Sequence, residues 1–288
     1  MLRRAVTLIA LLMVSGFADS ARAACQPDRQ QINDNNSLIL LGGTAKGALR
    51  QFAMGEFGKN VDYQRRLLGQ FDRCGTLTRA DLSYYKHEAG VSVNMGQRIL
   101  QVKSGWQEMY ELSVVVERDG KPMEVNHKQG TVSYRRDKTG KIVSATDRFL
   151  LSGKPGLTQI SYRYDRHQRL SKRVAEGSDD NVNGTINYAW NRRNQPLAIS
   201  SDSSKMTFSY DKQGREQRQT LVSISDVSSS STTDNCQLWD DNGNCTLSYS
   251  HETEVFAQGK IRRNITSAYR FEYWPPEKKP ARPPVPGH

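Results

Sequence analysis

The residues best suited to chemistry in this chain are the acids and amides between Asp179 and Trp190. The segment reads DDNVNGTINYAW and matches the opening of a calcium-binding EF-hand loop, with an acid, two asparagines and a glycine in the ligand spacing. The twelfth position requires a bidentate glutamate but holds Trp190, and strand-like sequence follows where a helix should begin. We therefore interpret the segment as an Asx-rich turn and predict no metal site.

Other catalytic arrangements are incomplete in the sequence. The five histidines are scattered, and no pair has the spacing of zinc ligands. Gly42–Gly47 (GGTAKG) resembles a phosphate-binding loop, but the Walker spacing fails and a tight turn is the better interpretation. The sequence contains no Gly-x-Ser-x-Gly and no His-Glu-x-x-His motif. We therefore predict no catalytic residue and no cofactor.

One enzymatic interpretation stays open. Folding could bring together carboxylates among Glu88, Glu108, Glu111 and Glu117, and paired carboxylates are what glycoside hydrolysis requires. Sequence spacing alone gives this pairing no support. A periplasmic hydrolase acting on cell-wall or glycan substrates is therefore the alternative to a protein without enzymatic activity.

Four cysteines, Cys25, Cys74, Cys236 and Cys245, offer a different chemistry. An even number of cysteines in an exported chain indicates two disulfides rather than a metal site or a nucleophile. Three connectivities are possible. We favour Cys236–Cys245, which flank a turn and could cross-link the two arms of one hairpin, and Cys25–Cys74 then follows by elimination. A three-residue loop with a bulge would place the first pair on opposite faces, so the connectivity stays open.

The first 23 residues are predicted to be a signal peptide. Two arginines precede the apolar run Ala5–Val14, and Ala21-Arg22-Ala23 has the form of a cleavage site. The apolar run is too short to span a bilayer, which takes about 20 residues. We therefore expect an exported, periplasmic protein that is cut after Ala23.

Lipid anchoring through Cys25 is the alternative location. A lipoprotein signal places leucine and small residues directly before the modified cysteine, whereas Arg22-Ala23-Ala24 precede it here. The sequence therefore favours cleavage without a lipid.

The charge of the chain favours anionic partners. Cleavage would remove three basic side chains and one acidic side chain, so the net charge of +11 would fall to +9. In a bacterial envelope, the matching partners are anionic lipid head groups, anionic glycans and acidic protein surfaces. We expect no nucleic acid as a partner and at most peripheral membrane contact, and the sequence leaves the oligomeric state open.

One sequence pattern, a strand followed by a turn, recurs along the chain. This pattern predicts that β-hairpins position these residues. Its copies are Val132–Val143, Ile160–Leu170, Ile186–Leu197, Phe208–Arg215 and Cys236–Leu247. Apolar and aromatic residues alternate along each strand, as in Ile160, Tyr162 and Tyr164, which predicts one buried face. Asp or Asn begins each turn, and Gly140, Gly214 and Gly243 can supply a positive φ. The turn positions 137, 165, 191, 211 and 240 are unevenly spaced, which excludes a strict solenoid.

These patterns predict an all-β fold, an antiparallel meander of hairpins forming an extended, twisted or curved sheet. We expect a signal peptide over residues 1–23, a polar leader over 24–37, a single β-rich domain over 38–272 and a Pro-rich disordered tail over 273–288. The apolar run from Leu38 predicts a first strand, and the Ser/Thr-rich Ser223–Asn235 predicts a mobile loop.

Two resemblances follow from these residues. Tyr210–Arg215 (YDKQGR) resembles the YD repeats of RHS-type proteins, which build curved β-sheets. Leu41–Phe52, Gly69–Leu82 and the cysteine-flanked turn at 236–245, together with the first two hairpin copies, resemble the YnfC-like family of enterobacterial envelope lipoproteins. The resemblance implies an envelope location and no catalytic residue. This chain departs from the family in the context of its first cysteine and in its Pro-rich tail.

Export, hairpins, positive charge and the lack of a catalytic motif together favour a non-enzymatic envelope protein that binds a protein or glycan surface. A periplasmic immunity protein that neutralises a toxin is one form of this hypothesis.

Overall fold

The computed structural model describes Cys25 and residues 29–276. The predicted signal peptide and residues 277–288 of the predicted tail lie outside the described residues, whereas Tyr273 is the last residue of a strand.

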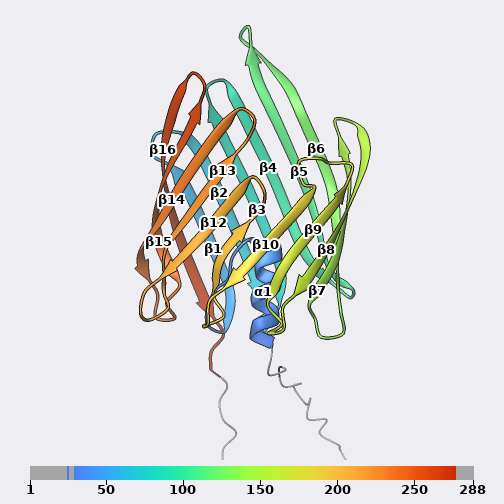
Figure 1. Ribbon diagram of the computed structural model, residues 1–288, viewed down its shortest axis with the longest axis vertical. Coiled ribbons are helices and arrows are strands. Elements are labelled where there is room, and N and C mark those ends of the chain that lie inside the picture. The colour runs from blue at the N-terminus through green and yellow to red at the C-terminus, as the bar shows by residue number, and fades with distance from the viewer. Residues whose placement is uncertain (1–24, 26–28, 277–288) are drawn as a thin grey trace, which may run out of the picture.

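The fold is a closed barrel of sixteen antiparallel strands, in which each strand pairs with its neighbours in sequence and β16 pairs with β1 (Figure 1). The all-β meander of hairpins is confirmed, but the sheet is closed and not extended. Closure follows from the pairing of Gln51–Gly58 with Ile265–Glu272, which leaves no edge strand unpaired. The strands are β1 (Leu49–Gly58), β2 (Asp62–Phe71), β3 (Leu77–Glu88), β4 (Val91–Val102), β5 (Gly105–Arg118), β6 (Lys121–Arg136), β7 (Ile142–Leu151), β8 (Lys154–Tyr164), β9 (Leu170–Gly177), β10 (Gly184–Trp190), β11 (Pro196–Ser200), β12 (Ser204–Tyr210), β13 (Glu216–Ile224), β14 (Ser228–Trp239), β15 (Cys245–Phe256) and β16 (Gly259–Tyr273).

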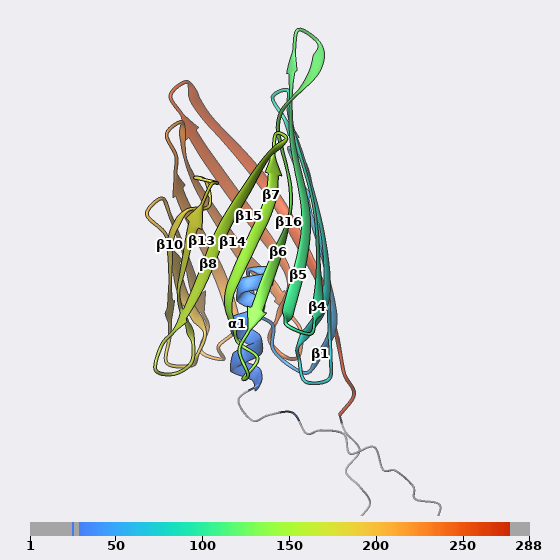
Figure 2. The ribbon, with the colours of Figure 1, turned by 90° about the vertical axis from the view of Figure 1, so that its right-hand side faces the viewer.

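The barrel has two different ends. The turn end is formed by the turns at residues 72–76, 103–104, 137–141, 165–169, 191–195, 211–215 and 240–244. The opposite end, the mouth, is formed by the hairpin turns between β1 and β2, β3 and β4, and so on around the barrel. Helix α1 (Arg29–Leu41) lies inside the barrel at the turn end, and the described chain both begins and ends there (Figures 1 and 2).

The apolar core lies inside the barrel, around α1. Strand residues alternate between a buried lumenal side chain and an outward one, as β2 shows from Arg65 to Phe71. The predicted aromatic faces line this lumen, where Tyr162 and Phe208 are buried. Other members of the core are Leu38, Leu40, Phe52, Met54, Leu67, Ile99, Trp106, Ile142 and Leu170.

Helix α1 differs from the sequence prediction. The boundary expected between residues 37 and 38 falls inside the helix, and the run Leu38–Leu41 completes α1 instead of forming a strand. The sequence does not reveal this helix. Its first part is polar and includes Asn33, Asn35 and Asn36, and the leucines come only at its end. All three asparagines are nevertheless buried, since each meets a turn of the barrel.

Asn35 shows how α1 is held. Its Nδ2 donates to the carbonyl of Gln168 (2.8 Å), and its Oδ1 accepts from the N–H of Leu170 (2.9 Å). The side chain is fully buried, and one amide therefore satisfies two backbone groups of one turn. We call this set of contacts the asparagine latch. Its other members are Asn33 Nδ2 to the Cys74 carbonyl (2.6 Å), Asn36 Nδ2 to the Gly140 carbonyl (2.9 Å) and the Ile142 N–H to Asn36 Oδ1 (3.1 Å).

The Ser/Thr-rich segment is also different. Ser223–Asn235, predicted as a mobile loop, forms the end of β13, a tight turn and most of β14. Thr220, Thr232 and Thr233 are β-branched, and Ser223 and Ser230 face each other across the pair with their hydroxyls 2.7 Å apart. Local composition predicted a linker, whereas cross-strand pairing makes this segment part of the wall.

Two disulfides are formed, Cys25–Cys74 and Cys236–Cys245, with Cα atoms 5.5 Å and 5.8 Å apart. The first joins the chain just before α1 to the turn at 72–76. The second crosses the hairpin formed by β14 and β15. This is the favoured connectivity among the three that the sequence left open.

Replacing Asn35 with alanine should destabilise the protein by about 2–5 kcal/mol, because a buried carbonyl and a buried N–H each lose their partner at about 1–3 kcal/mol. Urea unfolding at neutral pH measures this. Ser37→Ala on the same helix is the control and should change the free energy of unfolding by less than about 0.5 kcal/mol. Equal effects of the two substitutions would contradict the latch.

Removing the Cys25–Cys74 bridge with serines should cost about 4 kcal/mol of stability, and removing Cys236–Cys245 about 3 kcal/mol. The order follows from the sequence separations of 49 and 9 residues, because the longer loop gains more entropy in the unfolded chain. Thermal unfolding of the two double variants gives the comparison. Non-reducing peptide mapping that links Cys25 or Cys74 to the β14–β15 hairpin would refute the connectivity.

Candidate functional site

Six turns of the turn end share one hydrogen-bonding scheme. The first residue is Asp or Asn, its backbone N–H donates to the carbonyl four residues later, and its side-chain oxygen accepts from N–H groups two and four residues on. At Asp165, the N–H groups of His167 and Arg169 donate to Oδ1 at 2.8 Å and 2.9 Å. The first residues of the six turns are Asp72, Asp137, Asp165, Asn191, Asp211 and Asp240.

The fourth residue of each turn has a positive φ. Gly140, Gly214 and Gly243 have φ of 98°, 77° and 79°, which confirms the role predicted for them. Gln168 and Asn194 take the same place at 61° and 58°. The turn that begins at Asp72 escaped the sequence reasoning, although its Phe-Asp-Arg-Cys-Gly order repeats the same pattern.

The second residue of these turns points away from the barrel and is almost always a cation. Where the first residue is fixed inward by its hydrogen bonds, the next side chain is exposed at the tip. Asp241 is the exception among the six turns. Together with two neighbours, these side chains form a ring of cations made of Arg73, Lys103, Lys138, Arg166, Arg192, Arg193 and Lys212, all exposed.

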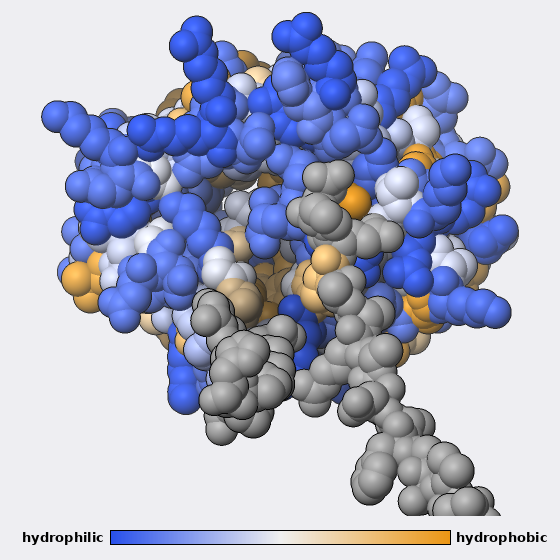
Figure 3. Space-filling view, turned by 90° about the horizontal axis from the view of Figure 1, so that it is seen from below, coloured by the Kyte–Doolittle hydropathy of each residue, from blue (hydrophilic) through white to orange (hydrophobic). Residues whose placement is uncertain are grey.

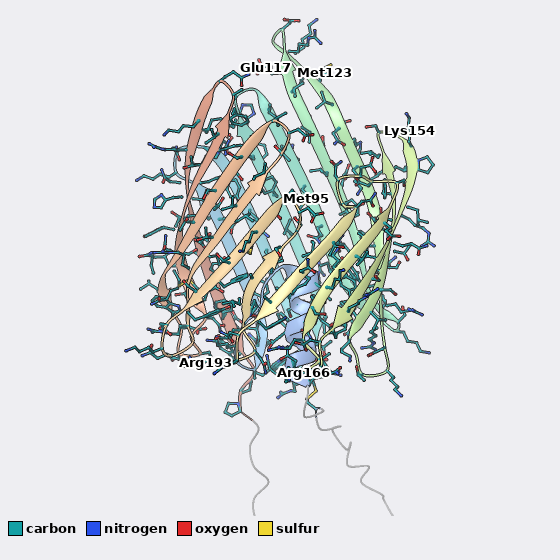
Figure 4. The ribbon with its side chains drawn as sticks, viewed as in Figure 1. Met95, Glu117, Met123, Lys154, Arg166 and Arg193 are labelled. Carbon is teal, nitrogen blue, oxygen red and sulfur yellow. A yellow bond between two sulfur atoms is a disulfide. The ribbon has the colours of Figure 1, made fainter. Side chains whose placement is uncertain are left out.

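The ring of cations encircles a hollowed end. Seen from below, polar side chains project around the rim, and apolar residues lie in the central hollow (Figure 3). Arg166 and Arg193 lie at this end, opposite Glu117, Met123 and Lys154 at the mouth (Figure 4).

Two of the turn aspartates, Asp165 and Asp211, are paired with an arginine of their own turn and lie below the exposed tip. Arg169 contacts Asp165 through Nε and Nη2 at 2.8 Å and 2.7 Å, and Arg215 contacts Asp211 through Nε at 2.7 Å. Burial alone would raise the pKa of the Asp165 carboxyl, but the backbone N–H and guanidinium of Arg169 outweigh it and hold the pKa below its ordinary value. Each such aspartate is thus engaged within its own turn.

The four candidate carboxylates of a hydrolase are separated. Glu108 is a lumenal residue, 8% exposed, that accepts a hydrogen bond from the Tyr134 hydroxyl (2.7 Å), and burial raises its pKa. Glu111 faces outward beside His127, at 3.0 Å. Glu88 pairs with the buried Arg263 in the lumen, and Glu117 lies near the mouth (Figure 4). The structure therefore brings no two of them into a shared cleft within the part of the chain that it describes.

The Asx-rich segment at 179–183 is a turn at the mouth. Asp179 contacts the Lys128 ammonium at 2.7 Å, and Asp147 lies 3.4 Å from the same group. The ring of Phe149 also contacts the Lys128 ammonium, with its centroid 4.2 Å from the nitrogen. In residues 29–276 and Cys25, no group of three or more His, Cys, Asp or Glu side chains is placed to hold a metal ion.

Comparison with known proteins gives a distant likeness in fold. No protein-family model matches the chain, and no curated protein matches it significantly. A solved structure of a porin-like protein from Bacteroides uniformis is similar at 11% identity and a TM-score of 0.43, over 79% of this chain and 99% of that one. The YnfC-like resemblance stays a prediction.

Among the described residues, no helix is both long and apolar enough to cross a membrane.

The outer wall of the barrel carries charges halfway along its strands. Asp81 faces outward on β3 and pairs with Arg79 (2.6 Å) and Arg98 (2.7 Å). Arg66 and Arg148 are likewise outward and exposed. These charges lie on the same wall as exposed apolar side chains such as Leu68 and Met109.

Asp165→Asn should lower stability at pH 7 by about 0.5–1 kcal/mol, because the amide keeps the turn acceptor but loses the ion pair with Arg169. Since the folded-state pKa of Asp165 is depressed, its contribution is present above the unfolded value of about 4 and is lost as the pH falls through the folded value. Urea unfolding at pH 7 and pH 2.5 tests this. A difference that persists unchanged at pH 2.5 would refute the ion pair as its cause.

Proposed function

We propose that this chain is an exported, non-enzymatic envelope protein that docks on an anionic lipid surface through its ring of cations. The observation that carries the proposal is the division of charge within one repeated turn, with the acid held inward and the cation exposed at the tip. Arg166 above the engaged Asp165 is the clearest example.

The shape of this end supports a broad, planar partner. The cations come from different turns spaced around one end of a barrel, so they surround the end and do not gather in a cleft (Figure 3). A bilayer surface can meet all of these charges at once.

The strength of such docking is modest and depends on salt. A Lys or Arg near an anionic membrane surface contributes about 1 kcal/mol, and the attraction falls off within a Debye length of about 8–10 Å. Seven exposed cations, of which Arg73 also stacks over Trp274 (4.8 Å), are enough for reversible binding.

The disulfides support the location. Two disulfides with no free cysteine are typical of proteins that fold in an oxidising compartment. We propose that this compartment is the periplasm. The sulfur of Cys25 is engaged with Cys74 and cannot also carry a lipid. We therefore favour peripheral contact over the lipid anchor implied by the YnfC-like resemblance.

Sedimentation with vesicles tests this function. The full mature chain should bind vesicles containing phosphatidylglycerol in low salt, should bind neutral phosphatidylcholine vesicles at least tenfold more weakly, and should be released at about 0.5 M salt, where surface charges are screened. A variant with Lys138, Arg166, Arg192 and Arg193 changed to glutamine should lose at least tenfold in affinity, because four cations are removed.

The control removes the same charge elsewhere. Arg148, Lys154, Lys205 and Lys260 are exposed on the wall and at the mouth, and their change to glutamine should alter binding less than twofold. Equal losses in the two variants would show that net charge alone acts and would overturn the proposal. Binding to an acidic protein but not to anionic vesicles would favour a protein partner, such as a toxin, in its place.

A further inference from the structure

A groove crosses the outer wall of the barrel, away from the turn end. It has a volume of about 970 Å³ and runs from β16 over β1, β2, β3, β4 and β5 to β6. A second hollow of about 450 Å³ continues it and shares Arg66, Ser83, Gly96 and Glu111. Ligand sites in proteins typically measure about 300–1,000 Å³, so the groove has room for a small molecule.

Small outward residues create the groove. Ala268, Gly55, Arg66, Ser83 and Gly96 lie side by side on five adjacent strands, and four of these five have little or no side chain. A Cβ added at Gly96 would meet no atom within 4 Å, which shows that the space above this strand is empty. The strand backbone therefore forms the floor.

Exposed apolar side chains stand along the groove. Phe57 is 46% exposed, Leu68 38% and Met109 42%, although the wall around them is polar. Residues of this kind that line one hollow, and are not scattered singly, mark a surface that an apolar partner covers.

Arginines line the same groove, and one of them has no partner. Arg66 is exposed and, within the described residues, makes no ion pair or side-chain hydrogen bond. Arg98 is engaged with Asp81 (2.7 Å), and Arg270 with Glu272 (3.1 Å). Glu111 contacts His127 (3.0 Å). The guanidinium of Arg66 is thus free to take an anion, and guanidinium groups bind carboxylates in a bidentate manner.

We infer that this groove binds a medium-chain fatty acid such as laurate, with the chain over Leu68, Met109 and Gly96 and the carboxylate on Arg66. The exposed apolar side chains along the groove account for the chain, and the unpaired cation beside them accounts for the head group. The site is separate from the ring of cations, and the inference does not rest on the proposed docking.

Calorimetric titration of the full mature chain with laurate below its micellar concentration tests the inference. Laurate should bind saturably, whereas butyrate, which has the same head group and no long chain, and dodecyltrimethylammonium, which has the same chain and a cationic head group, should each bind at least tenfold more weakly. Equal binding of laurate and the ammonium would overturn the role of Arg66, and the absence of saturable laurate binding would overturn the site.

Two variants and their matched controls locate the site. Gly96→Leu fills the groove without a steric clash and should weaken laurate binding at least tenfold, while Ala189→Leu, an outward change on β10, should leave it unchanged. Arg66→Gln should weaken laurate binding about fivefold or more, and Arg163→Gln on β8 should not. Unchanged laurate binding in Gly96→Leu would place the ligand elsewhere and refute the inference. The variant of the ring of cations should bind laurate like the wild type even if vesicle binding fails, which separates the two proposals.

Discussion

The asparagine latch is the interaction on which the rest of this barrel depends. Sixteen strands enclose a lumen too wide for wall side chains alone to fill, and α1 supplies the missing core at the turn end. A helix buried against turns meets backbone carbonyls and N–H groups that have lost water, and asparagine offers a donor and an acceptor in one side chain. Asn35 can therefore satisfy Gln168 and Leu170 together, and it lets Leu38 and Leu40 pack among the lumenal residues. Without the latch, burying α1 would leave these groups unpaired.

The same turns that receive the latch also create the charged surface. An Asx residue at the first position must face its own backbone, and this requirement directs the second side chain outward. Asp165 and Arg166 are neighbours in sequence, yet one is engaged with Arg169 and the other is exposed. The same turn structure, repeated around the barrel, therefore places acidic side chains within the turns and basic side chains at their tips. As a result, part of the net positive charge of the chain lies in a ring at one end of the molecule.

Local features could be predicted from the sequence, and non-local ones could not. The turn aspartates, the glycines with positive φ and the alternating aromatic strands depend on residues within about five positions of each other. The number of cysteines predicted two disulfides, and the turn between Cys236 and Cys245 favoured one connectivity among three. Closure of the barrel pairs Phe52 with Phe271, more than 200 residues apart. No local sequence pattern indicates this pairing. Helix α1 was missed because its asparagines are polar in sequence and buried only through turns as distant as Gln168. The groove was missed because Gly96 looks like an ordinary strand glycine until its neighbours on adjacent strands are known.

The positions of the two proposed surfaces are compatible with simultaneous use. Gly55 lies six residues from Leu49, the first residue of β1 at the turn end, and a strand rises about 3.3 Å per residue. Arg66, which pairs with Gly55, therefore lies about 20 Å from the ring of cations, measured along the strand. This distance exceeds the Debye length of about 8–10 Å at physiological salt, so the cations at the turn end contribute little to the field at Arg66. A barrel resting on its turn end would leave the groove on the wall open to water, and a ligand there would be held by the wall's own arginine and not by the surface beneath.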